Sequence, residues 1–218
     1  MGLIINPRGT SGSGKTELVR RILAQYGWQT RTGGAGAGGL EPVYRMGRSR
    51  PLGYRLAHPL GGRPLAVLGH YEVRSGGCDT IRAADGGLDE IMRRAADYAA
   101  TGHDVLIEGQ RLSSDYARSI ELARSRRLHV LRLTTPLEQC ARNLVWRRRA
   151  RRDTWPSVAG TVADEHELVA QACARLARHA TVEALGFDDA FARAQDLLGV
   201  RQRGNGARWP APELMRAE

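Results

Sequence analysis

The sequence has 218 residues, of which 42% are hydrophobic and 26% are charged. This length suits one α/β domain with a buried core and is short for two. The sequence contains no run of about 20 apolar residues, which excludes a membrane-spanning helix, and we expect no signal peptide because its first residues carry no basic leader. Cys78, Cys140 and Cys173 lack the spacing of a zinc site, so we expect free thiols in a cytoplasmic protein.

The net charge is the most unusual bulk property of the chain. It is +10, from 33 basic and 23 acidic residues. Such a surplus favours a polyanionic partner such as nucleic acid. The composition, rich in Arg, Ala and Gly, is also typical of GC-rich coding, so charge alone leaves both explanations open. All basic residues but one are arginine, and the single lysine is Lys15.

The first half of the chain begins with a short buried strand, a glycine-rich loop and an amphipathic helix. A second glycine-rich segment and a polar loop separate the elements that follow. The expected elements are a strand at Leu3–Asn6, a helix at Thr16–Tyr26, a loop at Trp28–Leu40, paired strands at Tyr54–Ala57 and Pro64–Leu68, a polar loop at Gly69–Asp85, and a helix at Gly87–Thr101.

The second half alternates strands with helices, which predicts a mostly parallel sheet wrapped by helices. Thr135, Pro136 and Glu138 resemble an N-cap, a first-turn proline and a capping box. The expected elements are strands at Asp104–Glu108, Leu128–Leu133 and Thr181–Leu185, and helices at Ser113–Ser125, from Thr135, at Val162–His179 and at Asp188–Leu198. We therefore predict a three-layer α/β/α fold in residues 1–200, and a flexible tail in residues 201–218.

The glycine-rich loop carries the most specific motif. The residues Gly9, Thr10, Ser11, Gly12, Ser13, Gly14, Lys15 and Thr16 match GxxxxGK[ST] in full, between an expected strand and an expected helix. Such a Walker A loop, or P-loop, turns backbone N–H groups and a helix N-terminus toward phosphates. Lys15 is expected to bridge the β- and γ-phosphates of ATP, and the Thr16 hydroxyl is expected to hold Mg²⁺.

Three acidic residues are candidates for the rest of the chemistry. Glu108 ends a buried strand beside the loop, where it could act on the Mg²⁺ site or pair with an arginine. Asp79 lies among glycines in a polar loop and could orient an acceptor hydroxyl and accept its proton. Glu72 competes with Asp79 for that role. His70 and Tyr71 could contact a base or serve only the structure.

Arginines concentrate in two segments. The first follows Thr135 and predicts a lid, at about residues 142–160, that closes guanidinium groups over the transferring phosphoryl group; Arg142 and Arg147 are its catalytic candidates. It also contains Arg148, Arg149, Arg151 and Arg152. The second segment interleaves Arg45, Arg48, Arg50 and Arg55 with Tyr44 and Tyr54, a pattern compatible with gripping a nucleic-acid strand and stacking on its bases.

Several segments together resemble bacteriophage P-loop kinases, and within them the 5-hydroxymethyluracil DNA kinases. The segments are Arg8–Thr16, Gly69–Glu72, Gly76–Ile81, Gly102–Gly109 and Thr135–Cys140. The resemblance spans roughly Leu3 to Leu198, and its Gly-Gly-Cys-Asp-Thr segment is far more distinctive than the phosphate loop. It implies phosphorylation of the hydroxymethyl group of a base in finished DNA, a step of thymidine hypermodification. It also implies ATP and Mg²⁺ residues at Lys15 and Thr16, and the acceptor-side acid at Asp79.

We therefore expect an ATP- and Mg²⁺-dependent kinase that acts on a modified pyrimidine in DNA. If a phage encodes it, the kinase is expected to act in the cytoplasm of the phage's host. One alternative is a kinase of small nucleosides or nucleotides. Another is a P-loop ATPase that hydrolyses nucleotide without an acceptor. A GTPase is disfavoured because its guanine-reading Asn-Lys-x-Asp segment needs a second lysine.

Overall fold

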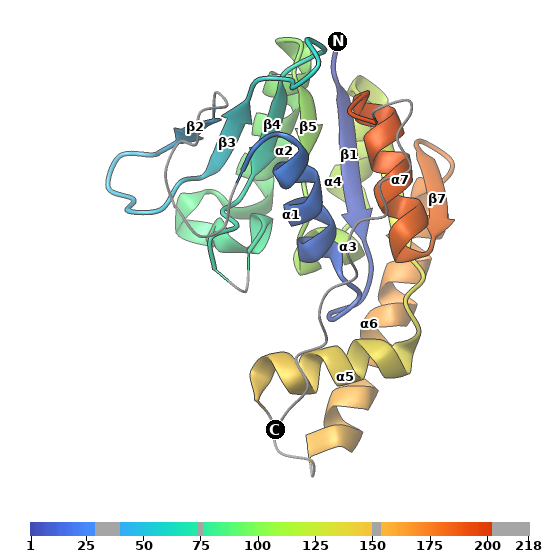
Figure 1. Cartoon of the computed structure of the whole chain (residues 1–218). Coiled ribbons are helices and arrows are strands. Elements are labelled where there is room, and N and C mark those ends of the chain that lie inside the picture. The colour runs from blue at the N-terminus through green and yellow to red at the C-terminus, as the bar shows by residue number, and fades with distance from the viewer. Residues whose placement is uncertain (29–39, 74–75, 150–153, 202–218) are drawn as a thin grey trace.

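A mostly parallel β-sheet runs through the centre of the molecule (Figure 1). The structure is a computed structural model that describes residues 1–28, 40–73, 76–149 and 154–201. Within these ranges the sheet has seven strands in the order β2-β3-β4-β5-β1-β6-β7. The α/β class and the mostly parallel sheet predicted from the alternating pattern are confirmed.

Five neighbouring strands of the sheet run parallel, and two further strands at one end of the sheet are added by antiparallel pairing. The parallel strands are β4 (Leu65–Leu68), β5 (Asp104–Leu106), β1 (Leu3–Arg8), β6 (Arg127–Leu133) and β7 (Thr181–Leu185), and the antiparallel extension consists of β3 (Gly53–Leu56) and β2 (Leu40–Val43). All six residues of β1 are buried, as a central parallel strand covered on both faces requires.

Helices cover both faces of the sheet because neighbouring strand residues point to opposite sides. On one face, Leu3 and Ile5 pack with α1 (Lys15–Gln25) and α7 (Phe187–Leu198). On the other face, Ile4 packs in a second apolar cluster. That cluster includes residues of α2 (Gly87–Ala100), α4 (Ala117–Ser125) and α6 (Trp155–Leu176).

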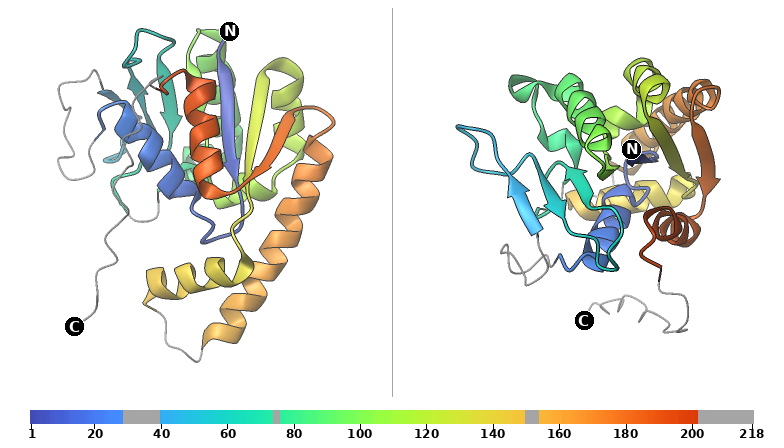
Figure 2. Two further views of the ribbon diagram at one scale, coloured as in Figure 1. Left: turned by 45° about the vertical axis from the view of Figure 1, so that its right-hand side comes forward. Right: turned by 90° about the horizontal axis from the view of Figure 1, so that it is seen from above.

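Two helices extend beyond the sheet as an arm. The arm consists of α5 (Leu137–Arg148) and the first half of α6, and it stands apart from the sheet in Figure 1 and in the left view of Figure 2. It has an apolar cluster of its own, formed by Cys140, Ala141, Leu144, Val158 and Val162. The lid predicted at about residues 142–160 falls within this arm. Residues 150–153 of that lid, which include Arg151 and Arg152, lie outside the described ranges.

Some expected element boundaries are wrong. The helix expected at Ser113–Ser125 is two helices, α3 (Gln110–Ser114) and α4, because Asp115 is extended. Its carbonyl accepts a hydrogen bond from Arg8 Nη1, and its carboxylate accepts one from the N–H of Ser119 near the start of α4.

The capping box is also wrong. Pro136 occupies the N-cap of α5 with no side-chain cap, and the Thr135 hydroxyl instead donates to the carbonyl of Ser13 at 2.9 Å. Helix α6 begins at Trp155, seven residues before the expected start. Strand β2 was not expected. The flexible tail predicted for residues 201–218 lies almost wholly outside the described ranges. Within them, no helix is long and apolar enough to span a membrane.

The separate apolar cluster predicts that the arm can loosen without unfolding the sheet. Leu144→Ala removes a fully buried side chain from that cluster, at a cost of about 2–5 kcal/mol. We expect faster amide hydrogen exchange in α5 and the start of α6 and unchanged exchange in β1 and β6. The matched variant Leu131→Ala, in β6, should lower the melting temperature of the whole chain. If Leu144→Ala instead lost protection from amide hydrogen exchange equally in the arm and in the sheet, that result would contradict this division.

Candidate functional site

The loops that follow β1, β4 and β5 meet at one edge of the sheet and face the arm. They line a cleft of about 1200 Å³. The glycine-rich loop, Glu108 and Gln110 lie at its base, and Gly47–Arg50 and Asp79–Asp85 contribute to one wall. Asn143, Trp146 and Arg147 of α5 form the other wall. The carboxyl edge of parallel strands is where open α/β sheets place their ligands.

The glycine-rich loop follows β1 directly and ends in the N-terminus of α1. Gly12 and Gly14 have φ of 83° and 99°, which a side chain would strain. A Cβ on Gly12 would also lie 2.2 Å from the carbonyl oxygen of Cys140. The loop therefore packs closely on α5, and the side chain of Asn143 donates to the carbonyl of Gly12 at 2.8 Å.

Lys15 turns its ammonium group back into this loop. Its Nζ donates to the carbonyls of Gly9 and Thr10 at 2.7 and 3.0 Å and to the side-chain oxygen of Gln110 at 3.1 Å. Burial lowers the pKa of Lys15, and the nearby carboxylate of Glu108 opposes that shift. The only ammonium side chain of the protein is thus held at the base of the cleft.

Glu108 follows β5 by two residues, and its carboxylate favours the charged form of this ammonium group. It is 1% exposed, and it accepts a hydrogen bond from the Thr16 hydroxyl at 3.1 Å. Burial raises the pKa of Glu108 to about 7, and the charge of Lys15 partly offsets the rise. Thr16 and Glu108, both expected at a metal, are therefore adjacent. The described residues include no group of three or more His, Cys, Asp or Glu side chains arranged to hold a metal ion.

The Gly-Gly-Cys-Asp-Thr segment packs against the end of β5. Gly77 has a φ of 88°, and a Cβ there would lie 2.3 Å from Oε1 of Glu108. Cys78 is buried, and its N–H donates to the carbonyl of Glu108 at 2.7 Å. The next residue, Asp79, accepts hydrogen bonds from the N–H groups of Gln110 and Arg111 at 2.5 and 3.3 Å. Asp79 is thereby fixed on the cleft surface.

Glu72 lies in a different environment and does not line the cleft. It accepts a hydrogen bond from the hydroxyl of Tyr54 at 2.7 Å, and its carboxylate is 3.7 Å from Nδ1 of His70. Tyr71 and Tyr54 are buried, so neither ring can stack on a base as its place in the sequence suggested. His70 is 2% exposed but borders the cleft.

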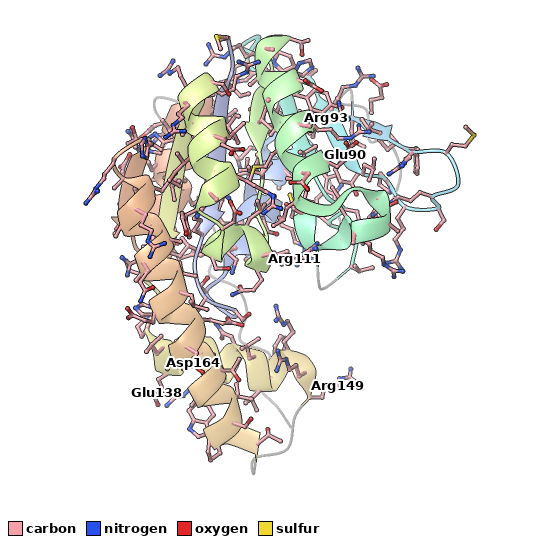
Figure 3. The ribbon with its side chains drawn as sticks, turned by 180° about the vertical axis from the view of Figure 1, so that it is seen from behind. Glu90, Arg93, Arg111, Glu138, Arg149 and Asp164 are labelled. Atoms are coloured by element: carbon pink, nitrogen blue, oxygen red, sulfur yellow. The ribbon has the colours of Figure 1, made fainter. Side chains whose placement is uncertain are left out.

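The arginine-rich segments divide between the cleft and the outer surface. Arg147 lines the cleft, whereas Arg142 pairs with Glu138 on the exposed side of α5. Arg48 and Arg50 line the opposite wall, and Arg48 is paired with Asp85. Four other arginines of these segments do not line the cleft: Arg45, Arg55, Arg148 and Arg149. Arg55 pairs with Glu41, and Arg149 lies at the end of α5 (Figure 3).

Three residues that contact the glycine-rich loop were missed in the sequence. Gln110 contacts Lys15 through its side chain and Asp79 through its N–H, and its only signal was its position just after β5. Glu165, on α6, accepts hydrogen bonds from the N–H and hydroxyl of Ser11 at 2.7 and 3.1 Å. Asn143 binds Gly12. Glu165 and Asn143 lie more than 130 residues from their partners, so no local pattern could have revealed them.

One curated protein is similar to this chain over most of its length. It is the 5-hmdU DNA kinase of Pseudomonas phage PaMx11, which is 39% identical over 156 residues. The match covers 71% of this chain and 74% of the phage protein. No protein-family model matches the chain.

The burial of Glu108 predicts a pH-dependent stability of the metal-free protein. Its pKa is raised from 4.5 to about 7, so the folded state binds this proton more tightly than the unfolded state. The resulting stability is complete below pH 4.5 and is lost as the pH rises through 7. We expect the free energy of unfolding of the wild type to fall, relative to Glu108→Gln, by about 3 kcal/mol across that window. Urea denaturation in EDTA measures this difference, and parallel pH profiles would contradict it.

Proposed function

The chain belongs to the 5-hmdU DNA kinase family, and from this premise we propose that it transfers the γ-phosphoryl group of ATP to the hydroxymethyl group of 5-hydroxymethyluracil in DNA. The observation that carries the proposal is the double contact of Gln110. Its side chain binds Lys15, at the base of the cleft, and its N–H binds Asp79, on the adjoining wall. A phosphoryl donor and a hydroxyl acceptor could therefore meet between these two residues.

The glycine-rich loop fits a triphosphate as a P-loop. The hydroxyl of Ser13 is buried with no hydrogen-bond partner among the described residues, as a group that awaits a ligand would be. The N-terminus of α1 and the ammonium group of Lys15 face the same loop, and both favour an anion.

The oxygen atoms of Thr16 and Glu108 fit Mg²⁺. Mg²⁺ takes oxygen ligands, binds few protein groups and is held largely by phosphates and water. The adjacent hydroxyl and carboxylate match that pattern. Thr16 would hold the ion and Glu108 would order its surroundings, so that the ion offsets negative charge on the phosphates.

Asp79 is the better candidate for the acceptor-side base. Its carboxylate lines the cleft and is paired with the guanidinium group of Arg111 at 3.3 Å, while Glu72 is outside the cleft and accepts a hydrogen bond from Tyr54. The two N–H groups that bind Asp79 fix its orientation. A carboxylate held in this way can orient the acceptor hydroxyl and take its proton during transfer.

Arg147 is the better of the two arginine candidates on the arm. It lines the cleft, where a guanidinium group can stabilise charge on the transferring phosphoryl group. Arg142 would need to leave Glu138 to do so. We propose that the arm is the Arg-rich lid of a P-loop kinase, and that the enzyme acts in the host cytoplasm.

The assignment of the base predicts opposite outcomes for two acidic residues. Asp79→Asn should lower kcat by about 100-fold or more while the affinity for ATP stays nearly constant. The matched variant Glu72→Gln should keep kcat close to that of the wild type. Steady-state phosphate transfer with each variant measures both values. A large loss of kcat in Glu72→Gln and none in Asp79→Asn would reverse the assignment.

The acceptor class is tested with ATP labelled at the γ-phosphate. We expect label on DNA that contains 5-hydroxymethyluracil, and none on matched DNA that contains thymine. Digestion to nucleosides should locate the label on the base. Efficient transfer to the free nucleotide, with little to DNA, would establish the small-molecule kinase instead. Phosphate release at one rate with and without acceptor would favour an ATPase.

A further inference from the structure

The outer part of the cleft contains an aromatic side chain that the proposed chemistry does not use. Trp146 lines the cleft and is 71% exposed. It lies on α5, whose buried residues Cys140, Ala141 and Leu144 form the apolar cluster of the arm. Trp146 is not part of that cluster. A large indole ring exposed on a ligand cleft is a surface suited to a planar partner.

Trp146 lies near the end of α5, beyond the part of the helix that contacts the glycine-rich loop. The helix begins near the end of β6 and passes the glycine-rich loop, where Asn143 contacts Gly12. It then continues toward the side of the molecule that carries β3 and β4 (Figures 1 and 3). Trp146 lies almost one turn beyond Asn143 along this helix, and both Trp146 and Asp79 line the cleft.

The wall on the β4 side carries exposed arginines. Arg50 and Arg82 are exposed there, and both line the cleft. Arg82 makes no side-chain hydrogen bond or ion pair with another residue in the described part of the chain. An aromatic platform facing guanidinium groups is the combination that binds an unpaired nucleic-acid strand, since the ring stacks on a base while the cations hold phosphates.

The position of Asp79 requires the acceptor base to enter between the two walls. Enzymes that modify a base usually extrude it from the duplex, because the stacked base does not reach an enclosed site. This inference rests on the proposed function. We propose that the acceptor base leaves its duplex partner and stacks on Trp146, while Arg50 and Arg82 hold the phosphates beside it.

Binding to a fluorescent single-stranded oligonucleotide with one 5-hydroxymethyluracil, without ATP, tests the stacking. Trp146→Ala should raise its Kd by about 5- to 100-fold, and Trp146→Phe should restore most of the affinity. The matched control is Tyr116→Ala. Tyr116 is 40% exposed, lies outside the cleft and packs against Arg175, so its replacement should leave the Kd unchanged. The proposal would be overturned if Trp146→Ala left the Kd for the oligonucleotide unchanged, or if this variant raised the Kd for ATP and not the Kd for the oligonucleotide.

Base extrusion has its own readout. An acceptor base in a mismatch costs less to extrude than a paired one, so wild-type kcat/KM should be higher for mismatched than for matched duplex. A preference for the matched duplex would mean that the hydroxymethyl group is reached in the major groove, and would overturn extrusion. Absence of label on every DNA would defeat the proposed function instead, while the binding assay would still report on Trp146.

Discussion

The burial of one ammonium group constrains the rest of the site. Lys15 is 7% exposed and binds two carbonyls of its own loop and Gln110. Removing a cation from water costs several kcal/mol unless anions lie near it, and Glu108 and Glu165 are the carboxylates that favour the charged form of Lys15 most. These carboxylates come from the segment just after β5 and from α6, so the same charge ties the sheet and the arm to one loop. A bound triphosphate would add negative charge at the same place.

Much of the fold could be predicted because its signals are local. The alternation of apolar strands and amphipathic helices indicated a parallel sheet, and every strand named in advance is present within a few residues. The errors arose where tertiary contacts override local preference. Thr135 has the sequence of an N-cap, but its hydroxyl binds Ser13. Ser113–Ser125 has a continuous helical pattern, but the buried guanidinium group of Arg8 holds Asp115 in an extended conformation.

The site residues that could be predicted from the sequence are those that come soon after the end of a strand. The glycine-rich loop, Glu108 and Asp79 each come after a strand or in the loop beyond it, and the parallel order brings such positions together. Residues such as Glu165 and Trp146 lie on helices whose packing is set by distant contacts. Of the two tyrosines between arginines, Tyr54 is buried and only Tyr44 is exposed, and Tyr71, a separate candidate beside His70, is buried as well.

The central claim is that the ammonium group of Lys15, held in its loop, grips the phosphates that are transferred. The most direct test is phosphate transfer to DNA containing 5-hydroxymethyluracil by Lys15→Arg, which keeps the charge but replaces a compact ammonium with a broad guanidinium plane. The pocket formed by two carbonyls and one amide oxygen leads us to expect a loss of about 100-fold or more. Transfer at the wild-type rate, with unchanged affinity for ATP, would contradict the account.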